Sequence, residues 1–369
     1  MERNRIIDMA KGIGIILVII GHTFCSSSYV HQFVYTFHMQ LFLFVSGYVM
    51  SDKYLKTGIS KRIFPLLLYY VEFCIVGAAI TLLMPNKVIP LNLNSFLLWV
   101  LIWFQPEVFW AGYLWFVIVL AMCIIIFFVV NNIFEKTIMR ILSTFVMFSV
   151  SMLFNSLNAY TVIGEHGYED VFKIQTSMAA FLFFELGYIS KKLCLTEKLQ
   201  KKSWFFNLTV LLVGAVGTVL SHYINGDVNI VQVALLPSVD PAIYLLGSFL
   251  GILMVLSGVI LLDKIVVFRK MMLWYGKNSL QIYLTHIWLI MLYTIVCISV
   301  LKIGVDTTTP LTSALGMQIG GNLTSTAALI GVVLICLVEI PITKLYDITL
   351  GRLNKYILSK NNSKKQLIK

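Results

Sequence analysis

The chain has 369 residues, of which 59% are hydrophobic and only 12% are charged, and its mean hydropathy is +0.88. A soluble chain would carry about twice this fraction of charged residues, so composition excludes a soluble globular protein. The apolar runs are continuous rather than alternating, which predicts an all-α integral membrane protein and excludes a β-barrel.

The formal net charge of +11 would suit a nucleic-acid partner, but the positions of the charges argue against one. Almost all Lys and Arg residues lie in every second predicted connection, the pattern typical of cytoplasmic loops in membrane proteins. The six cysteines are scattered without metal-ligand spacing, so we expect no metal and interpret them as small buried hydrophobes. No small-residue cleavage site follows the first apolar run, so we do not expect a cleavable signal peptide.

Taken in chain order, the apolar runs predict about ten transmembrane helices, since one span needs about 20 residues. Both termini then lie in the cytoplasm. Residues 1–350 form one transmembrane domain, and residues 351–369 form a basic cytoplasmic tail. The predicted spans cover residues 7–25, 32–50, 62–84, 112–131, 138–157, 173–190, 204–223, 241–262, 279–301 and 322–345. Residues 85–111 are rich in Trp and contain no full span, which favours an interfacial helix on the outer side.

The first span carries three ionisable residues, Asp8, Lys11 and His22. At about 100° per residue, His22 returns to within about 20° of Lys11, and Asp8 lies within about 60° of Lys11. One helix face therefore presents an acid, a cation and an imidazole, and such groups inside a membrane indicate a functional site. The alternative is that Asp8 and Lys11 lie at the cytoplasmic rim, with Lys11 extending its ammonium to water.

The second span carries His38 and Ser46. His38 lies among phenylalanines and is either functional or an ordinary core histidine. Ser46 and Gly47 are also typical of residues that let two membrane helices pack closely.

These residues carry a resemblance to a known family. The segment from Arg5 to Tyr48 resembles the opening of acyltransferase family 3, in particular its fucose 4-O-acetylase-like branch. In that family a Lys or Arg precedes a His by eleven positions, as Lys11 precedes His22. The family signature FHMPLFFFxSG is similar to FHMQLFLFVSG at residues 37–47, where Gln40 replaces the usual Pro. We expect this replacement to affect the local backbone rather than the chemistry.

Later segments extend the resemblance over nearly the whole chain. Residues 276–286 are similar to the family motif GxxSxxIYLxH. Weaker similarities lie at residues 61–65, 114–116 and 339–341.

The resemblance implies an enzyme, an O-acetyltransferase of a bacterial inner or plasma membrane. Such enzymes pass an acyl group, commonly acetyl from acetyl-CoA, to a hydroxyl of a surface polysaccharide or lipid-linked sugar. We therefore expect acyl-CoA, a glycan or lipid-linked sugar and the lipid bilayer as partners, and no bound cofactor. Acetyl and succinyl remain alternatives for the acyl group.

The expected site has three parts. The catalytic residues are His22, Lys11, Asp8 and His38, where His22 acts as general base toward the acceptor hydroxyl or carries the acyl group itself. The residues expected to bind the phosphates of the donor are Arg62, Lys61 and Arg5, although ordinary positive-inside charge also explains them. The residues expected to line or support the acceptor cavity are Ser46, Trp115, Ser279, His286 and Glu339, and Trp115 alone is better explained by packing.

Two other functions compete with this one. A secondary transporter or flippase for a sugar or lipid-linked intermediate would show internal repeats or matching broken helices. We find neither, and Gly12 and Gly14 of the first span have no counterpart in the second half. A pseudoenzyme or sensor on the same fold is the second alternative, and intact Lys11, His22 and His38 argue against it.

Overall fold

The computed structural model describes residues 4–25, 27–51, 59–83, 112–160, 170–226, 239–301, 323–349 and 351, and this part of the chain is helical and without strands. Its α-helices are α1 (Arg5–Thr23), α2 (Tyr29–Tyr35), α3 (His38–Tyr48), α5 (Ser60–Leu83), α7 (Trp115–Ile133), α8 (Thr137–Tyr160), α9 (Ile174–Lys192), α10 (Leu195–Gln200), α11 (Trp204–Asn225), α13 (Pro241–Leu262), α14 (Val266–Ile295) and α16 (Ser325–Ile348). Short 3₁₀ turns precede α7 (Gly112–Leu114) and α9 (Val171–Lys173), and a π-helical turn follows α14 (Val296–Leu301).

Within the described residues, six helical segments are long and apolar enough to cross a membrane: Arg5–Thr23, Ser60–Ala79, Gly112–Ile133, Trp204–Asn225, Pro241–Leu262 and Ser325–Ile348. Thr137–Leu153 of α8 is a shorter apolar helix. The chain is therefore an all-α, multi-pass membrane protein. The number of ten spans and the cytoplasmic position of both termini stay predictions. The predicted interfacial helix at 85–111 and the tail from residue 352 lie outside the described residues.

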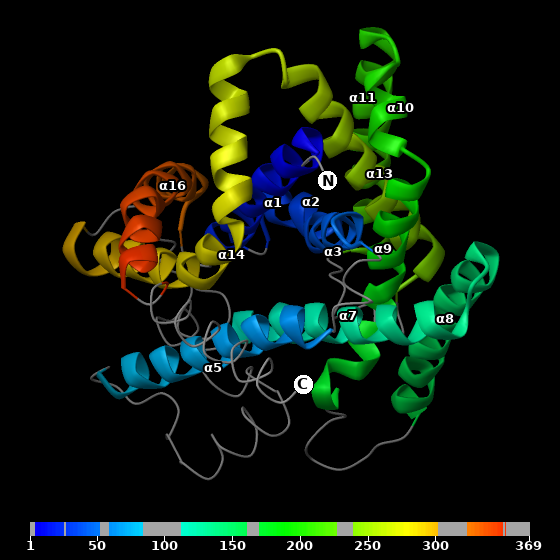
Figure 1. Ribbon diagram of the computed structural model, residues 1–369. Helices are drawn as coiled ribbons and strands as arrows, with labels where there is room; N and C mark the ends of the chain where they lie inside the picture. Colours follow the sequence, from blue (N-terminus) through cyan, green and yellow to red (C-terminus); the bar gives the residue numbers. More distant parts are fainter. Residues whose placement is uncertain are drawn as a thin grey trace.

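Helix α1 lies in the middle of the upper half of the molecule, packed against α3, α13, α14 and α16 (Figure 1). Asn4 begins the helix, because its side chain accepts hydrogen bonds from the amides of Ile6 and Ile7. The side-chain amide of Asn4 also donates a hydrogen bond to the hydroxyl of Thr196 in α10, at 2.9 Å. Asn4 thus caps α1 and also links the start of this helix to α10.

Two pairs of glycines allow the closest helix contacts. A Cβ atom at Gly12 would lie 2.1 Å from the carbonyl oxygen of Met272, and one at Gly276 would lie 1.9 Å from that of Asp8. Helices α1 and α14 therefore touch backbone to backbone. Gly47 and Gly187 do the same for α3 and α9, where added Cβ atoms would overlap the carbonyl oxygens of Phe184 and Phe44. Small residues permit such close approach between membrane helices.

The predicted second span at 32–50 is wrong as a single helix, because the chain breaks at Thr36 and Phe37 into α2 and α3. The break frees the carbonyl of Thr36, which accepts a hydrogen bond from the Ser248 hydroxyl on α13 at 2.9 Å. Phe37 is fully buried, and its ring occupies the space over Gly251, also on α13. Contacts with α13 thus satisfy and fill the break, which sequence periodicity alone does not reveal.

The ninth predicted span also needs correction, because α14 begins at Val266 rather than at 279. The basic segment expected to be a loop is helical through Gly276, and the ribbon of α14 bends along its length (Figure 1). Gly276 is tolerated inside this helix because α1 occupies the space where a side chain would stand. His286 consequently lies in the second half of a 30-residue helix rather than near the start of a short one.

Arg140 lies in α8, inside the predicted span at 138–157, and its side chain is buried. Its guanidinium pairs with Glu185 of α9, donating to the two carboxylate oxygens at 2.8 and 2.9 Å, and its Nη1 also donates to Asn131 of α7. The guanidinium carbon lies 4.6 Å from the centre of the Tyr188 ring. This ion pair joins three helices and gives the buried Glu185 carboxylate the partner that a buried charge requires.

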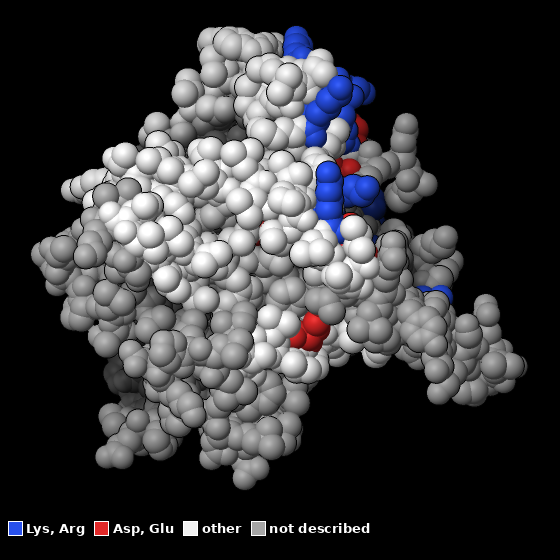
Figure 2. Space-filling model, turned by 90° about the vertical axis from the view of Figure 1, so that its left-hand side faces the viewer, with Lys and Arg blue, Asp and Glu red and all other residues white. Residues whose placement is uncertain are grey.

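Charged residues are few on one described side of the surface. In Figure 2, Lys and Arg gather near one edge of this side, and a small acidic patch lies lower down. Large apolar residues are exposed on several helices; Val216 on α11 and Val333 on α16, for example, have more than half of their surface accessible. A face of this kind suits contact with lipid chains rather than water.

We predict that Gly276→Ala lowers the melting temperature of the detergent-solubilised protein, because the new methyl group overlaps the Asp8 carbonyl and must push α1 and α14 apart. Overpacking of this kind costs about 1–3 kcal/mol, which corresponds to a fall of about 2 °C or more in a domain of this size. Gly258→Ala in α13 is the matched control, since its nearest new neighbour is the flexible end of Leu211 at 3.3 Å. Equal melting temperatures for the two variants would contradict the backbone contact.

We predict that Glu185→Leu destabilises the protein strongly, because it leaves the Arg140 guanidinium buried without its carboxylate. Breaking one side of a buried pair costs about 3–5 kcal/mol, whereas replacing both sides with apolar residues costs much less. The double variant Arg140→Met/Glu185→Leu should therefore melt at a higher temperature than Glu185→Leu alone. A double variant that melts below both single variants would show that the pair is not an isolated electrostatic unit.

Candidate active site

Two histidines from different helices meet near one end of α1. The ring centres of His22 in α1 and His286 in α14 are 5.3 Å apart and the rings are tilted by 47°. His22 lies in the last turn of α1 and is partly exposed, whereas His286 is completely buried. The close contact of α1 with α14 through Gly12 and Gly276 brings these two rings together.

Helix α2 covers His22 from the other side. The Tyr35 hydroxyl lies 3.5 Å from Nδ1 of His22. The ring of His31 is stacked on the ring of Tyr35 with centres 3.8 Å apart, and Nδ1 of His31 donates to the carbonyl of Gly21 at 2.7 Å. Gly21 has no side chain, and a Cβ atom there would come within 2.7 Å of the Tyr35 ring. Helix α2 is therefore fastened to the residue directly before His22.

His38 belongs to the same aromatic group. Its ring lies 4.8 Å from that of Tyr35, its side chain is buried, and its Nδ1 donates to the carbonyl of Val34 at 2.8 Å. The structure thus brings three predicted residues, His22, His38 and His286, into one cluster together with His31 and Tyr35. An imidazole nitrogen can accept a proton and return it, so this cluster can act in proton transfer.

Aromatic residues surround His286. The ring centres of Tyr113 and Tyr283 lie 6.0 and 5.8 Å from that of His286. The Tyr113 hydroxyl donates to the carbonyl of Leu284 and accepts from the indole of Trp288, while the Tyr283 hydroxyl donates to the carbonyl of Tyr113. Trp115 is not in direct ring contact with His286 and instead packs edge-on against Phe116.

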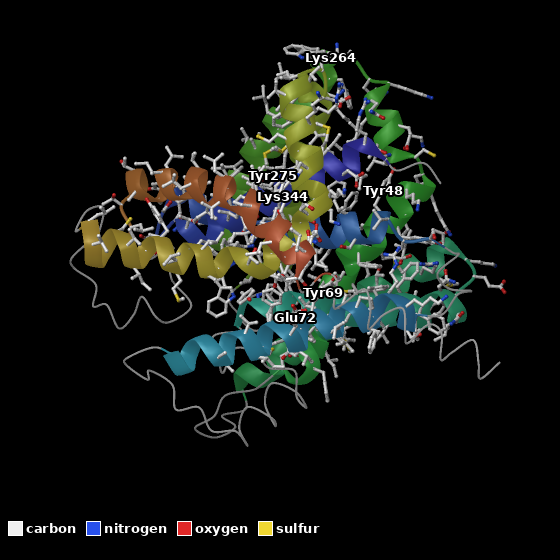
Figure 3. All side chains as sticks on the ribbon, turned by 60° about the vertical axis from the view of Figure 1, so that its left-hand side comes forward. Tyr48, Tyr69, Glu72, Lys264, Tyr275 and Lys344 are labelled. Carbon is white, nitrogen blue, oxygen red and sulfur yellow. The ribbon has the colours of Figure 1, made fainter. Side chains whose placement is uncertain are left out.

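Glu339 lies next to this cluster because it contacts Thr285, the residue that precedes His286. Its carboxylate is completely buried, and both oxygens lie within 3.0 Å of the Thr285 hydroxyl, which can donate a hydrogen bond to it. Helices α14 and α16 run side by side here, and Figure 3 shows Tyr275 and Lys344 in the same region. The figure also shows Tyr69 and Glu72 on α5, where the Tyr346 hydroxyl of α16 lies 3.5 Å from the Glu72 carboxylate.

Asp8 and Lys11 lie on α1 with His22 but closer to its start. Asp8 is buried and Lys11 is partly exposed, and the backbone of Asp8 forms part of the α1–α14 contact. At about 1.5 Å per residue, Lys11 is about 16 Å from His22 along the helix axis. These two residues therefore do not join the histidine cluster.

The predicted donor-binding residues lie on two helices, α1 and α5. Arg5 forms an ion pair with Asp263 at the end of α13, with nitrogen and oxygen 2.6 Å apart. At the start of α5, Lys61 is exposed and Arg62 is partly buried. Of the remaining supporting residues, Ser279 is buried in α14 and Ser46 is partly buried in α3.

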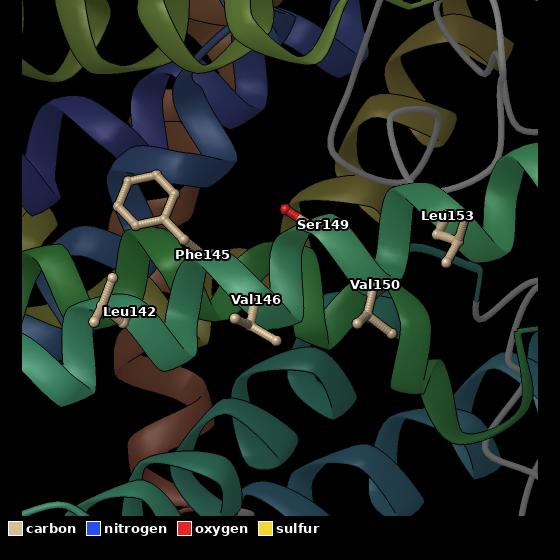
Figure 4. A pocket seen from close by; sticks show the side chains of 6 residues that line it. All are labelled: Leu142, Phe145, Val146, Ser149, Val150 and Leu153. Atoms are coloured by element: carbon tan, nitrogen blue, oxygen red, sulfur yellow. The ribbon is translucent and has the colours of Figure 1, made fainter.

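A hollow of about 320 Å³ lies on the surface of α8, away from the histidine cluster (Figure 4). Apart from Ser149, its lining is aliphatic or aromatic: Leu142, Phe145, Val146, Val150 and Leu153. Most of these side chains are about half exposed. The hollow offers no acid, base or nucleophile beyond one hydroxyl and suits a lipid-facing surface. Among the described residues, no group of three or more His, Cys, Asp or Glu side chains is arranged to hold a metal ion.

His31 and Tyr35 were not among the predicted site residues. Together with His38 they follow the spacing i, i+4, i+7, which places side chains on one face of a helix. This spacing was the available signal. The site depends on α2 folding back over the end of α1, which the predicted unbroken span at 32–50 did not include.

Comparison with known proteins gives one match. A family profile described as an acyltransferase domain, Acyl_transf_3, matches residues 4–340. No curated protein and no solved structure matches the chain significantly. The profile covers nearly the whole chain and includes the helices that carry His22, His38, His286 and Glu339. The chain therefore belongs to acyltransferase family 3.

Proposed function

We propose that this membrane acyltransferase moves an acetyl group from cytoplasmic acetyl-CoA to a hydroxyl of a surface-polysaccharide or lipid-linked sugar. The proposed location is the inner or plasma membrane of a bacterium. The observation that carries the proposal is the contact of partly exposed His22 with buried His286 at the crossing of α1 and α14. This arrangement offers a substrate a partly exposed imidazole directly beside a buried one.

The chemistry of the transfer needs a group that handles one proton. A sugar hydroxyl is a weak nucleophile until a base takes its proton, and a positioned histidine contributes about 10²–10⁴-fold to such reactions. In the proposed reaction, His22 takes the proton as the hydroxyl attacks the thioester carbonyl. In the alternative form, His22 first accepts the acyl group and then passes it to the hydroxyl.

The donor is proposed to enter at the end of α1 that carries Arg5, Asp8 and Lys11. Phosphate groups are best held by guanidinium groups, which form two parallel hydrogen bonds. Arg62 is the favoured anchor because it is a guanidinium in a partly buried position, whereas Lys61 is an exposed ammonium. The acetyl-bearing arm of the donor would then extend along α1 toward His22.

We predict that His22→Ala lowers acetyl transfer about a hundredfold or more, because the reaction loses its proton acceptor or acyl carrier. The measurement is the transfer of radiolabel from acetyl-CoA to a panel of methyl hexosides by purified protein in nanodiscs. His222→Ala is the matched control, since His222 lies at the far end of α11. Wild-type rates in His22→Ala, at equal protein abundance, would remove His22 from the mechanism.

We predict that Arg62→Ala raises the KM for acetyl-CoA about tenfold, whereas Lys61→Ala changes it much less. A charged hydrogen bond to phosphate is worth about 1.5–3 kcal/mol when it is partly shielded, while an exposed ammonium is screened by water and salt. Steady-state kinetics with acetyl-CoA as the varied substrate make the comparison. Equal effects of the two substitutions would show that the segment contributes only general positive charge.

A further inference from the structure

One polar atom in the histidine cluster has no partner. Nε2 of His286 is buried, and within the described residues no hydrogen-bonding group reaches it. A buried polar atom without a partner costs about 1–3 kcal/mol. Such atoms are uncommon in folded proteins and often mark the place where a ligand or water binds.

The other nitrogen of the ring determines what this atom can do. Nδ1 of His286 lies 2.7 Å from the carbonyl oxygen of Tyr283. A carbonyl oxygen only accepts hydrogen bonds, so Nδ1 must carry the proton. In the neutral ring Nε2 then presents a lone pair, and it needs a donor such as a hydroxyl group.

The neighbouring side chains do not provide that donor. The hydroxyl protons of Tyr113 and Tyr283 are directed to the carbonyls of Leu284 and Tyr113, respectively. The indole N–H of Trp288 is directed to the Tyr113 hydroxyl. The remaining ring next to His286 is that of His22, and His22 is partly exposed. The unpaired nitrogen of His286 therefore lies beside the residue that we propose to activate the acceptor.

We infer that His286 is a second substrate-contacting residue, whose Nε2 accepts a hydrogen bond from the sugar that receives the acyl group, beside His22. This inference rests on the proposed function. It gives His286, which the sequence suggested only as a residue lining or supporting the acceptor cavity, a specific role in selecting the acceptor. A site that hydrogen-bonds a hydroxyl discriminates strongly against analogues that lack it, because its own polar atom is then left unpaired.

The reaction balances with these two residues. The acceptor oxygen forms the new ester bond to the acyl carbon, and the carbon–sulfur bond of the thioester breaks. The hydroxyl proton passes to His22 and from there to the leaving thiolate, which departs as free coenzyme A thiol. His286 remains neutral and orients the acceptor sugar through Nε2.

Two substitutions of His286 distinguish the roles of its two ring nitrogens. In His286→Asn the amide nitrogen can replace Nδ1 and keep the bond to Tyr283, but nothing replaces Nε2. In His286→Gln the amide oxygen can reach the position of Nε2 and accept the hydrogen bond. We expect His286→Asn to lower kcat/KM for the best methyl hexoside about tenfold to a hundredfold, with the KM for acetyl-CoA within twofold of wild type. We expect His286→Gln to recover a large part of this loss.

The control is His222→Asn, because Nδ1 of His222 also bonds to a carbonyl, that of Gly226, but on an exposed part of α11. A wild-type kcat/KM in His286→Asn overturns the inference. An equal loss of kcat/KM in His286→Asn and His286→Gln, with the KM for the hexoside and the KM for acetyl-CoA changing in parallel, also overturns it. Loss of transfer in His22→Ala together with wild-type behaviour of His286→Asn overturns only the inference. Loss in His286→Asn with full activity in His22→Ala supports the inference and overturns the proposed role of His22.

Discussion

The backbone contact between α1 and α14 is the constraint on which the rest of the site depends. Gly12 and Gly276 let the two helices approach until the carbonyls of Asp8 and Met272 occupy the space of absent side chains. Inside a membrane, van der Waals packing of this kind replaces the hydrophobic effect as the force between helices. The same two helices carry His22 and His286, so the contact at the glycines also helps to set how these two rings meet further along.

The break between α2 and α3 completes the site from the opposite side. A continuous helix would carry His31 and Tyr35 away from the end of α1, whereas the break lets α2 lie over His22. Ser248 and Gly251 of α13 make the break stable by satisfying the Thr36 carbonyl and receiving the Phe37 ring. Helices α2, α3 and α14 thus place four rings, those of His31, Tyr35, His38 and His286, in one cluster with the partly exposed His22 of α1.

The sequence predicted the class of the fold, and it singled out several residues that the structure places close together. Both results follow from the apolar periodicity and from the cost of ionisable groups in lipid. Apolar length indicated a helical membrane protein, and ionisable residues inside apolar runs pointed to His22, His38, His286 and Glu339 because such residues are costly in lipid. Periodicity could not reveal the break at Thr36, since the apolar pattern continues through it. It also could not pair Arg140 with Glu185, because that contact joins helices whose relative positions depend on the whole fold.

The central claim is that acyl transfer takes place at the His22–His286 pair, with the donor approaching from the end of α1 that carries Lys11. The most direct measurement is a cryo-electron microscopy structure of the protein in nanodiscs with a non-hydrolysable analogue of acetyl-CoA. The account predicts the acyl carbon within about 4 Å of the His22 ring, close enough for reaction, and the phosphates near Arg62. An analogue bound with its acyl group away from both histidines, for example in the hollow on α8, would contradict it.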